Sequence, residues 1–149
     1  MSINLSLEQI YWLSQIALPL VAIAAASVAY WQVNTFKLFE LLKYTQSVEF
    51  RSARRVVIRE IGPLRDTSWW SEDRFEEAAS SCAAHYDVLG RTLLYGHSRR
   101  VSRFFVSQWA DSILRTYVIL APFIAQRRES GGNEYTGYEW LYRNAKKYR

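Results

Sequence analysis

Cys82, His85 and Asp87 are the closest group of residues in this sequence that could ligate a metal or form a nucleophile. Cys82 and His85 stand three residues apart, so a helix would place both on one face. A structural zinc site needs four ligands, and a catalytic one needs three and a water. The other histidine, His97, follows Gly96, where we expect the helix to end. We therefore expect no metal, no cofactor and a structural thiol at Cys82.

Arg54 and Glu139 are a second pair that could do chemistry, as partners in a pocket inside a helical domain. The chain contains no glycine-rich phosphate loop, no HExxH and no GxSxG. Arg54 stands near the apolar side of its helix, where an internal ion pair with a glutamate is favoured over a ligand contact. We assign no catalytic residue and keep an enzyme as the less favoured interpretation.

The elements that must position these residues follow one uncharged stretch, IYWLSQIALPLVAIAAASVAYW, at residues 10–31. A helix of about 20 apolar residues spans a bilayer. Aromatic residues are typical of the membrane interface, and they occur at both ends of this stretch, as Tyr11, Trp12, Tyr30 and Trp31. We predict a transmembrane helix over 10–31, preceded by a short outward-facing N-terminus at 1–9.

Two alternatives to a membrane span are a cleaved signal peptide and a buried helix of a soluble protein. Ser27, Val28 and Ala29 resemble a cleavage site, but no Lys or Arg precedes the apolar run, and the run exceeds the usual length of the apolar region of a signal peptide. Its length and lack of charge also argue against a soluble core helix. Lys and Arg follow the stretch, from Lys37 onward, which favours an N-terminus outside and a cytoplasmic remainder. In a bacterial cell, this orientation would place the span in the inner membrane.

A face of small residues runs along the predicted span. Small residues four positions apart allow close approach of two helices in lipid. Two such pairs overlap here, formed by Ala22 with Ala26 and by Ala25 with Ala29. We expect this face to pack against another membrane protein or against a second copy of the chain.

The rest of the chain reads as helices separated by short loops. Apolar residues at helical spacing and breaks at Gly62-Pro63 and Gly96 predict a helical extension at 32–46 and a bundle at 47–149. A second membrane pass near 110–124 is rejected because Asp111 and Arg115 interrupt it. The predicted fold class is all-α, with one N-terminal transmembrane helix and a cytoplasmic bundle of about four helices, at 47–61, 71–96, 98–124 and 134–147.

The part of the chain after the span is basic. All 19 Lys and Arg and every acidic residue except Glu8 follow residue 36, a net charge of about +6. Such a domain suits an anionic membrane surface, and the proposed lipid-headgroup contacts are Lys37, Arg51, Arg55 and Arg59. Arg99, Arg100 and Arg103 could contact nucleic acid, but no reader motif accompanies them. Membrane lipid is therefore the expected partner and nucleic acid is not.

Three segments in this order resemble an uncharacterised bacterial domain family of membrane-anchored helical proteins. They are LFELLKYTQSVEFRSARRVV (38–57), AASSCAAHYDVLGRTLLYG (78–96) and LAPFIAQRRESGGNEYTGYEWLYRNA (120–145). The resemblance implies one N-terminal span and a cytoplasmic helical bundle, and it implies no particular activity. By matching position, it marks five recurrent polar residues that we expect to form buried ion pairs, namely Glu49, Arg54, Asp87, Arg127 and Glu139.

These observations favour a non-enzymatic interaction or accessory subunit of a membrane protein complex. The alternative from a different class is a self-assembling membrane effector or sensor, and an enzyme with a pocket inside the bundle ranks below both. The residue pattern names no ligand, pathway or partner protein.

Overall fold

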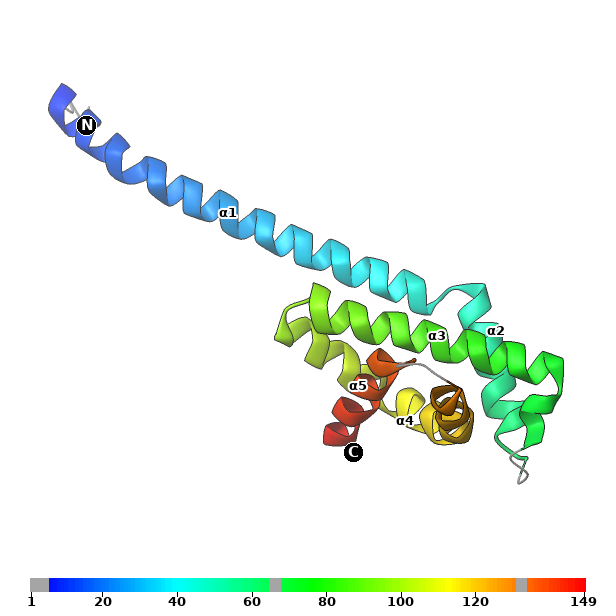
Figure 1. Cartoon of the computed structure of the whole chain (residues 1–149). Helices are drawn as coiled ribbons and strands as arrows, with labels where there is room; N and C mark the ends of the chain where they lie inside the picture. Colours follow the sequence, from blue (N-terminus) through cyan, green and yellow to red (C-terminus); the bar gives the residue numbers. More distant parts are fainter. Residues whose placement is uncertain (1–5, 65–67, 131–133) are drawn as a thin grey trace. The chain divides into compact units, whose positions relative to one another are not determined.

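The computed structural model describes residues 6–64, 68–130 and 134–149, and every regular element in these ranges is helical (Figure 1). The predicted all-α class is confirmed for this part of the chain. Five α-helices carry the fold: α1 (Leu7–Thr45), α2 (Val48–Val56), α3 (Asp73–Gly96), α4 (Arg99–Glu129) and α5 (Thr136–Ala145). Three short turns join them: the π-helical η1 (Val57–Ile61) and the 3-10 turns η2 (Ser68–Ser71) and η3 (Lys146–Tyr148).

The first helix, α1, is continuous over 39 residues, so the expected helical extension of the apolar stretch is present. The chain divides into two compact units after Lys37. The extension predicted at 32–46 is therefore split between the units. Residues from Leu38 onward belong to the second unit, where Leu41 and Thr45 are buried. Most of the predicted outward-facing segment 1–9 lies outside the described residues.

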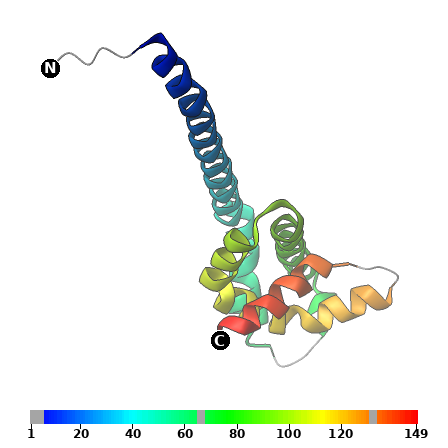
Figure 2. The same ribbon diagram turned by 90° about the vertical axis from the view of Figure 1, so that its left-hand side faces the viewer.

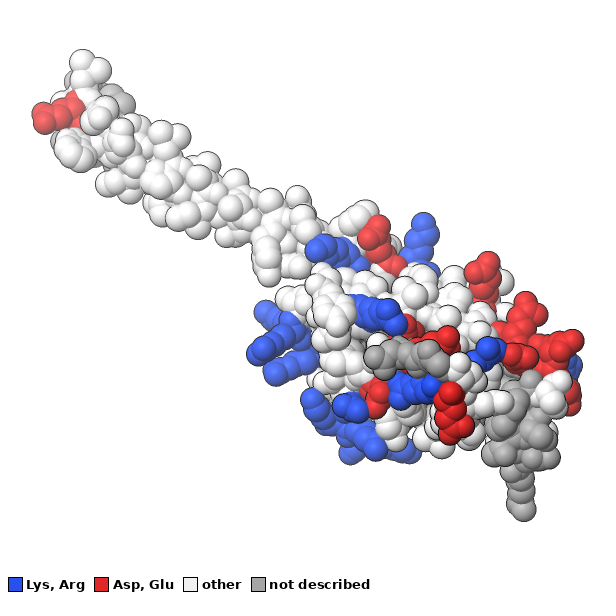
Figure 3. All heavy atoms as spheres, in the orientation of Figure 1, with Lys and Arg blue, Asp and Glu red and all other residues white. Residues whose placement is uncertain are grey.

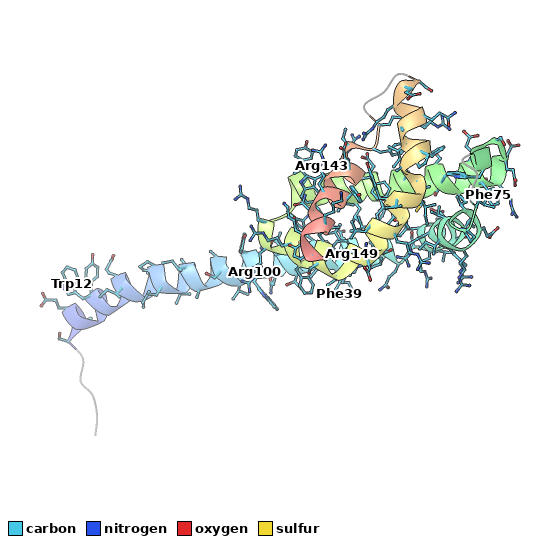
Figure 4. All side chains as sticks on the ribbon, turned by 90° about the horizontal axis from the view of Figure 1, so that it is seen from below. Trp12, Phe39, Phe75, Arg100, Arg143 and Arg149 are labelled. Carbon is cyan, nitrogen blue, oxygen red and sulfur yellow. The ribbon has the colours of Figure 1, made fainter. Side chains whose placement is uncertain are left out.

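Along the first unit, α1 exposes its apolar side chains. The helix contains an 18-residue window that is apolar enough to cross a membrane, and none of that window is buried. The side chain of Trp12 projects from the helix (Figure 4) and is 62% exposed. A core helix of a soluble domain would be mostly buried, and this window of α1 is not.

The second unit is a helical bundle in which α3 packs against both α2 and α5, while α4 packs against α5 and η1 (Figure 2). Serine side chains cap the N-termini of two of its helices. Ser47 Oγ accepts from the Phe50 amide at 3.3 Å, and Ser98 Oγ accepts from the Val101 amide at 3.4 Å. Such caps satisfy amide groups that the first turn leaves free. The largest fully buried side chains include Tyr86, Tyr138, Phe50, Phe105 and Phe123.

Several predicted helix boundaries differ from the observed ones, including the start of α3, at Asp73 rather than 71, and the end of α5, at Ala145 rather than 147. Helix α4, predicted over 98–124, continues to Glu129, and Pro122 lies inside it. Arg127 and Arg128 occupy its last turn, where positive charge interacts favourably with the helix dipole. The last helix begins at Thr136 rather than 134, because Tyr135 before it adopts a left-handed conformation with φ of 63°.

Asp87 of α3 fixes the start of α5. Its Oδ1 accepts from the amide of Gly137 at 2.7 Å and from the amide of Tyr138 at 3.3 Å. Its Oδ2 pairs with Arg91 Nε at 2.8 Å. The carboxylate thus caps α5 from another helix, in place of the side-chain cap that Tyr135 does not provide.

Candidate functional site

A groove of the bundle runs between the α2–η1 segment and α4. Its volume is about 1170 Å³. One wall of the groove contains Arg54, Ile58 and Gly62, which stand four residues apart. The other wall is formed by α4. The π-helical turn η1 forms part of this wall, and such turns are frequent at functional sites.

Arg54 is the half-buried cation of this groove. Its Nη1 donates to Ser112 Oγ at 3.3 Å. The guanidinium carbon lies 5.3 Å from the Trp109 ring centre and 5.6 Å from that of Phe50, so aromatic faces hold the charge. The expected buried ion pair is absent, because no carboxylate among the described residues pairs with Arg54. Its donors remain available to an anion.

Ser112 connects Arg54 to buried hydroxyl groups beneath the groove. The hydroxyl of Tyr86 lies 2.9 Å from Ser112 Oγ, and that of Tyr138 donates to Thr116 Oγ1 at 2.7 Å. The two tyrosine rings stack with centres 4.6 Å apart. Burial raises the pKa of both phenols above 10.0, so they stay neutral hydrogen-bonding groups. The floor of the groove is therefore fixed and uncharged.

The rim of the groove adds further charge. Arg115, Arg149 and Asp111 line it, and all three are exposed. Figure 4 shows Arg149 at the end of the chain. The groove thus combines three guanidinium groups with one carboxylate, beside apolar side chains and Trp109. Arg and Trp are enriched among the residues that dominate protein interfaces. This arrangement can bind an acidic group, and it holds no paired nucleophile and base.

Different surroundings hold the side chains of Cys82, His85 and Asp87. Burial raises the pKa of the Cys82 thiol to about 12, although the nearby Arg54 charge opposes this shift. His85 Nδ1 lies 2.7 Å from the Ser81 carbonyl, and its ring stacks on Phe50 at 5.4 Å. Asp87 is occupied by α5 and Arg91. No set of three metal-ligating residues occurs among the described residues.

The other residues that we expected to form buried ion pairs with one another have different partners or none among the described residues. Arg127 pairs with Glu76 at the surface, and Glu139 pairs with Arg128 at 3.0 Å and with Arg143. Glu49 is exposed and forms no ion pair with a described residue. None of the five predicted residues pairs with another of the five. The correction has a physical cause, because the partners come from another helix, as Glu76 does for Arg127, or from the next turn of the same helix, as Arg143 does for Glu139.

The electrostatics of Glu139 reflect its two partners. Burial alone would raise the pKa of this carboxyl, but hydrogen bonds from Arg143 and Arg128 outweigh burial and hold the pKa below 4.5. Glu139 does not line the Arg54 groove. Arg54 and Glu139 therefore do not share this groove.

The predicted membrane-facing residues all lie at the surface of their own unit. The aromatic residues Tyr11, Trp12, Tyr30 and Trp31 are exposed on α1, as are Ala22, Ala25, Ala26 and Ala29. Lys37 is exposed near the end of the first unit, and Arg51, Arg55 and Arg59 are exposed on α2 and η1. Figure 3 shows that, on the face in view, most Lys and Arg side chains of the bundle gather toward one end and most acidic side chains toward the other.

Sequence reasoning missed the partners of Arg54. Trp109 and Ser112 were assigned only to a helix, since their positions 55 or more residues away carry no local sign of a shared site. Comparison with protein-family models, curated proteins and solved structures gives no match to this chain. The resemblance to a bacterial membrane-anchored family therefore stays a prediction.

Proposed function

We propose that this protein is a single-pass, membrane-anchored accessory subunit of a membrane protein complex. The observation that carries the proposal is α1, whose apolar side chains are exposed along a window long enough to span a bilayer. Exposing this surface to water is unfavourable, whereas lipid or another transmembrane helix covers it.

The proposed location is the bacterial inner membrane, with the N-terminus outside and the bundle in the cytoplasm. The supporting observation is the charge distribution, because the basic residues lie from Lys37 onward. A reporter enzyme that is active only on the outer side of the inner membrane should be inactive when it is fused after Arg149. A fluorescent reporter that works only in the cytoplasm should be active at the same position. The reverse pattern would refute this orientation.

The Arg54 groove is the proposed contact surface of the bundle. Its half-buried guanidinium lacks a carboxylate partner within the described chain, and Trp109 lies beside it. An Asp or Glu side chain of a partner subunit would supply the missing charge, and the apolar wall would receive neighbouring side chains. The groove offers binding chemistry rather than acid–base chemistry, which favours an accessory role over an enzyme.

The alanine face of α1 provides a matched test of this function. Ala25→Leu places a larger side chain on that face, while Ala24→Leu places the same side chain about 200° around the helix from Ala22. The full chain is purified from native membranes in mild detergent, and co-purifying proteins are weighed by mass spectrometry. A stoichiometric partner retained by Ala24→Leu and lost by Ala25→Leu would support the proposal.

The same purification separates the second candidate. A homo-oligomer without another protein, disrupted by Ala25→Leu, would replace the accessory role with a self-assembling effector or sensor. A monomer that both variants leave unchanged would refute both roles for the alanine face.

A further inference from the structure

A second pocket, of about 430 Å³, shares no lining residue with the Arg54 groove. It forms where α3 ends and α4 begins, and α5 and η3 complete it. Neither Asp nor Glu is among the described residues that line it. This distinguishes it from the Arg54 groove, which includes Asp111.

Three cations line this pocket: Arg99, Arg103 and Lys147. Arg99 and Arg103 are exposed and form no ion pair with a described residue. Lys147 Nζ donates to Asn144 Oδ1 at 2.9 Å, a neutral acceptor that leaves its charge uncompensated. Mutual repulsion of three cations around one cavity is relieved when an anion lies between them.

His97 supplies an independent observation. Its Nδ1 lies 3.0 Å from the Thr92 carbonyl oxygen, which orients the ring. Its Nε2 is shielded from solvent and has no hydrogen-bond partner among the described residues, although His97 lines the pocket. Buried polar atoms without partners are rare in native proteins. The unpartnered nitrogen marks His97 as the residue of the pocket wall whose surroundings a bound ligand would change.

We propose that this pocket binds a phosphate group. Several converging cations with hydrogen-bond donors suit a multiply charged oxyanion, and Arg matches phosphate oxygens in pairs. Trp140, Leu94 and Val106 form an apolar side of the same pocket, next to the amide of Asn144. The phosphate can belong to an anionic lipid headgroup or be free in solution. This inference goes beyond the proposed function and does not depend on an accessory role.

The test uses the full chain in maltoside micelles, which contain no phosphate, and follows the ring resonances of His97 by NMR. His97→Gln assigns the signal against His85. One arm adds inorganic phosphate, with chloride at equal ionic strength as its reference. The other arm adds phosphatidylglycerol to the micelles, with phosphatidylcholine as its reference. A saturable shift of the His97 signal is expected in at least one arm, and the arm that responds names the source of the phosphate.

Two variants test the cations, and both change exposed side chains without a described ion pair. Arg103→Gln should weaken binding about threefold or more, and Arg99→Gln combined with it about tenfold. Arg100→Gln is the matched control, because Arg100 is an exposed arginine of α4 that does not line the pocket. Absence of a saturable shift in both arms would overturn the proposal. An equal loss of binding in Arg100→Gln would also overturn it, because the attraction would then be general to basic residues.

Discussion

Gly90 of α3 and Gly137 of α5 meet backbone to backbone, so closely that a Cβ atom on Gly90 would lie 2.0 Å from the Gly137 carbonyl oxygen. The reverse substitution is no easier, since a Cβ on Gly137 would lie 2.3 Å from the carbonyl oxygen of Asp87. Both oxygens belong to the backbone, which cannot move aside as a flexible side chain does. This contact sets the distance between α3 and α5.

Gly90→Ala should therefore destabilise the bundle by about 3 kcal/mol, at the upper end of the range for overpacking. Gly96→Ala, at the end of the same helix, meets only the Thr92 methyl at 3.9 Å and should change stability by less than about 1 kcal/mol. Urea unfolding of the full chain in detergent, followed by circular dichroism, measures both. Equal stability of the two variants would contradict the close contact.

Asp87 provides the second stability prediction, because its carboxylate caps α5 and pairs with Arg91. Asp87→Ala leaves two amide groups of α5 without that acceptor and should cost about 2 kcal/mol. Asp87→Asn keeps an acceptor oxygen and should cost about half as much. Asp111→Asn, at an exposed residue of α4, is the control and should be neutral. A neutral Asp87→Ala in the same unfolding assay would show that α5 starts without this cap.

Cys82 should be unreactive in the folded protein. Its side chain is fully buried, and burial raises the pKa of the thiol to about 12, so the reactive thiolate is scarce near neutral pH. Thiol alkylation followed by intact mass should therefore require unfolding. A variant combining Cys82→Ala with Ala84→Cys moves the thiol to an exposed position of α3 and should react rapidly without denaturant. Rapid alkylation of native Cys82 would contradict its burial.

Glu139 should contribute to stability only while it is ionised. Its pKa in the folded protein is below the ordinary 4.5, so its contribution is present above that ordinary value and is lost as pH falls through the folded-state pKa. Glu139→Gln should lower stability by about 1 kcal/mol at neutral pH. The difference from the unmodified chain should vanish in acid. A difference that persists unchanged in acid would contradict a role for the two ion pairs of Glu139.

The helices of this chain could be predicted from local patterns. The apolar stretch around Ala25 and the Ser47 cap mark elements that are present at or near the expected positions. These features depend on residues a few positions apart, where helical periodicity and capping act. The left-handed Tyr135 and the late end of α4 were missed, since both depend on contacts or charges beyond the local apolar pattern.

The sites could not be predicted in the same way. Arg54 was expected to pair with a glutamate, but Ser112 and Trp109 come to it from α4. The orphaned nitrogen of His97 likewise becomes visible only when α3, α4 and α5 enclose a pocket. Such relationships depend on the rotation and spacing of helices that are distant in sequence. The backbone contact of Gly90 with Gly137 belongs to this class, and no periodicity reports it.

The central claim is that α1 anchors the protein in a membrane, and extraction of isolated membranes tests it most directly. Membranes containing the full chain are washed with alkaline carbonate and then with urea, and the protein in pellet and supernatant is identified by intact mass. The claim predicts the uncleaved chain in the pellet after both washes. Release of the intact chain into the supernatant would contradict it, as would a shortened chain that has lost the residues through Ala29.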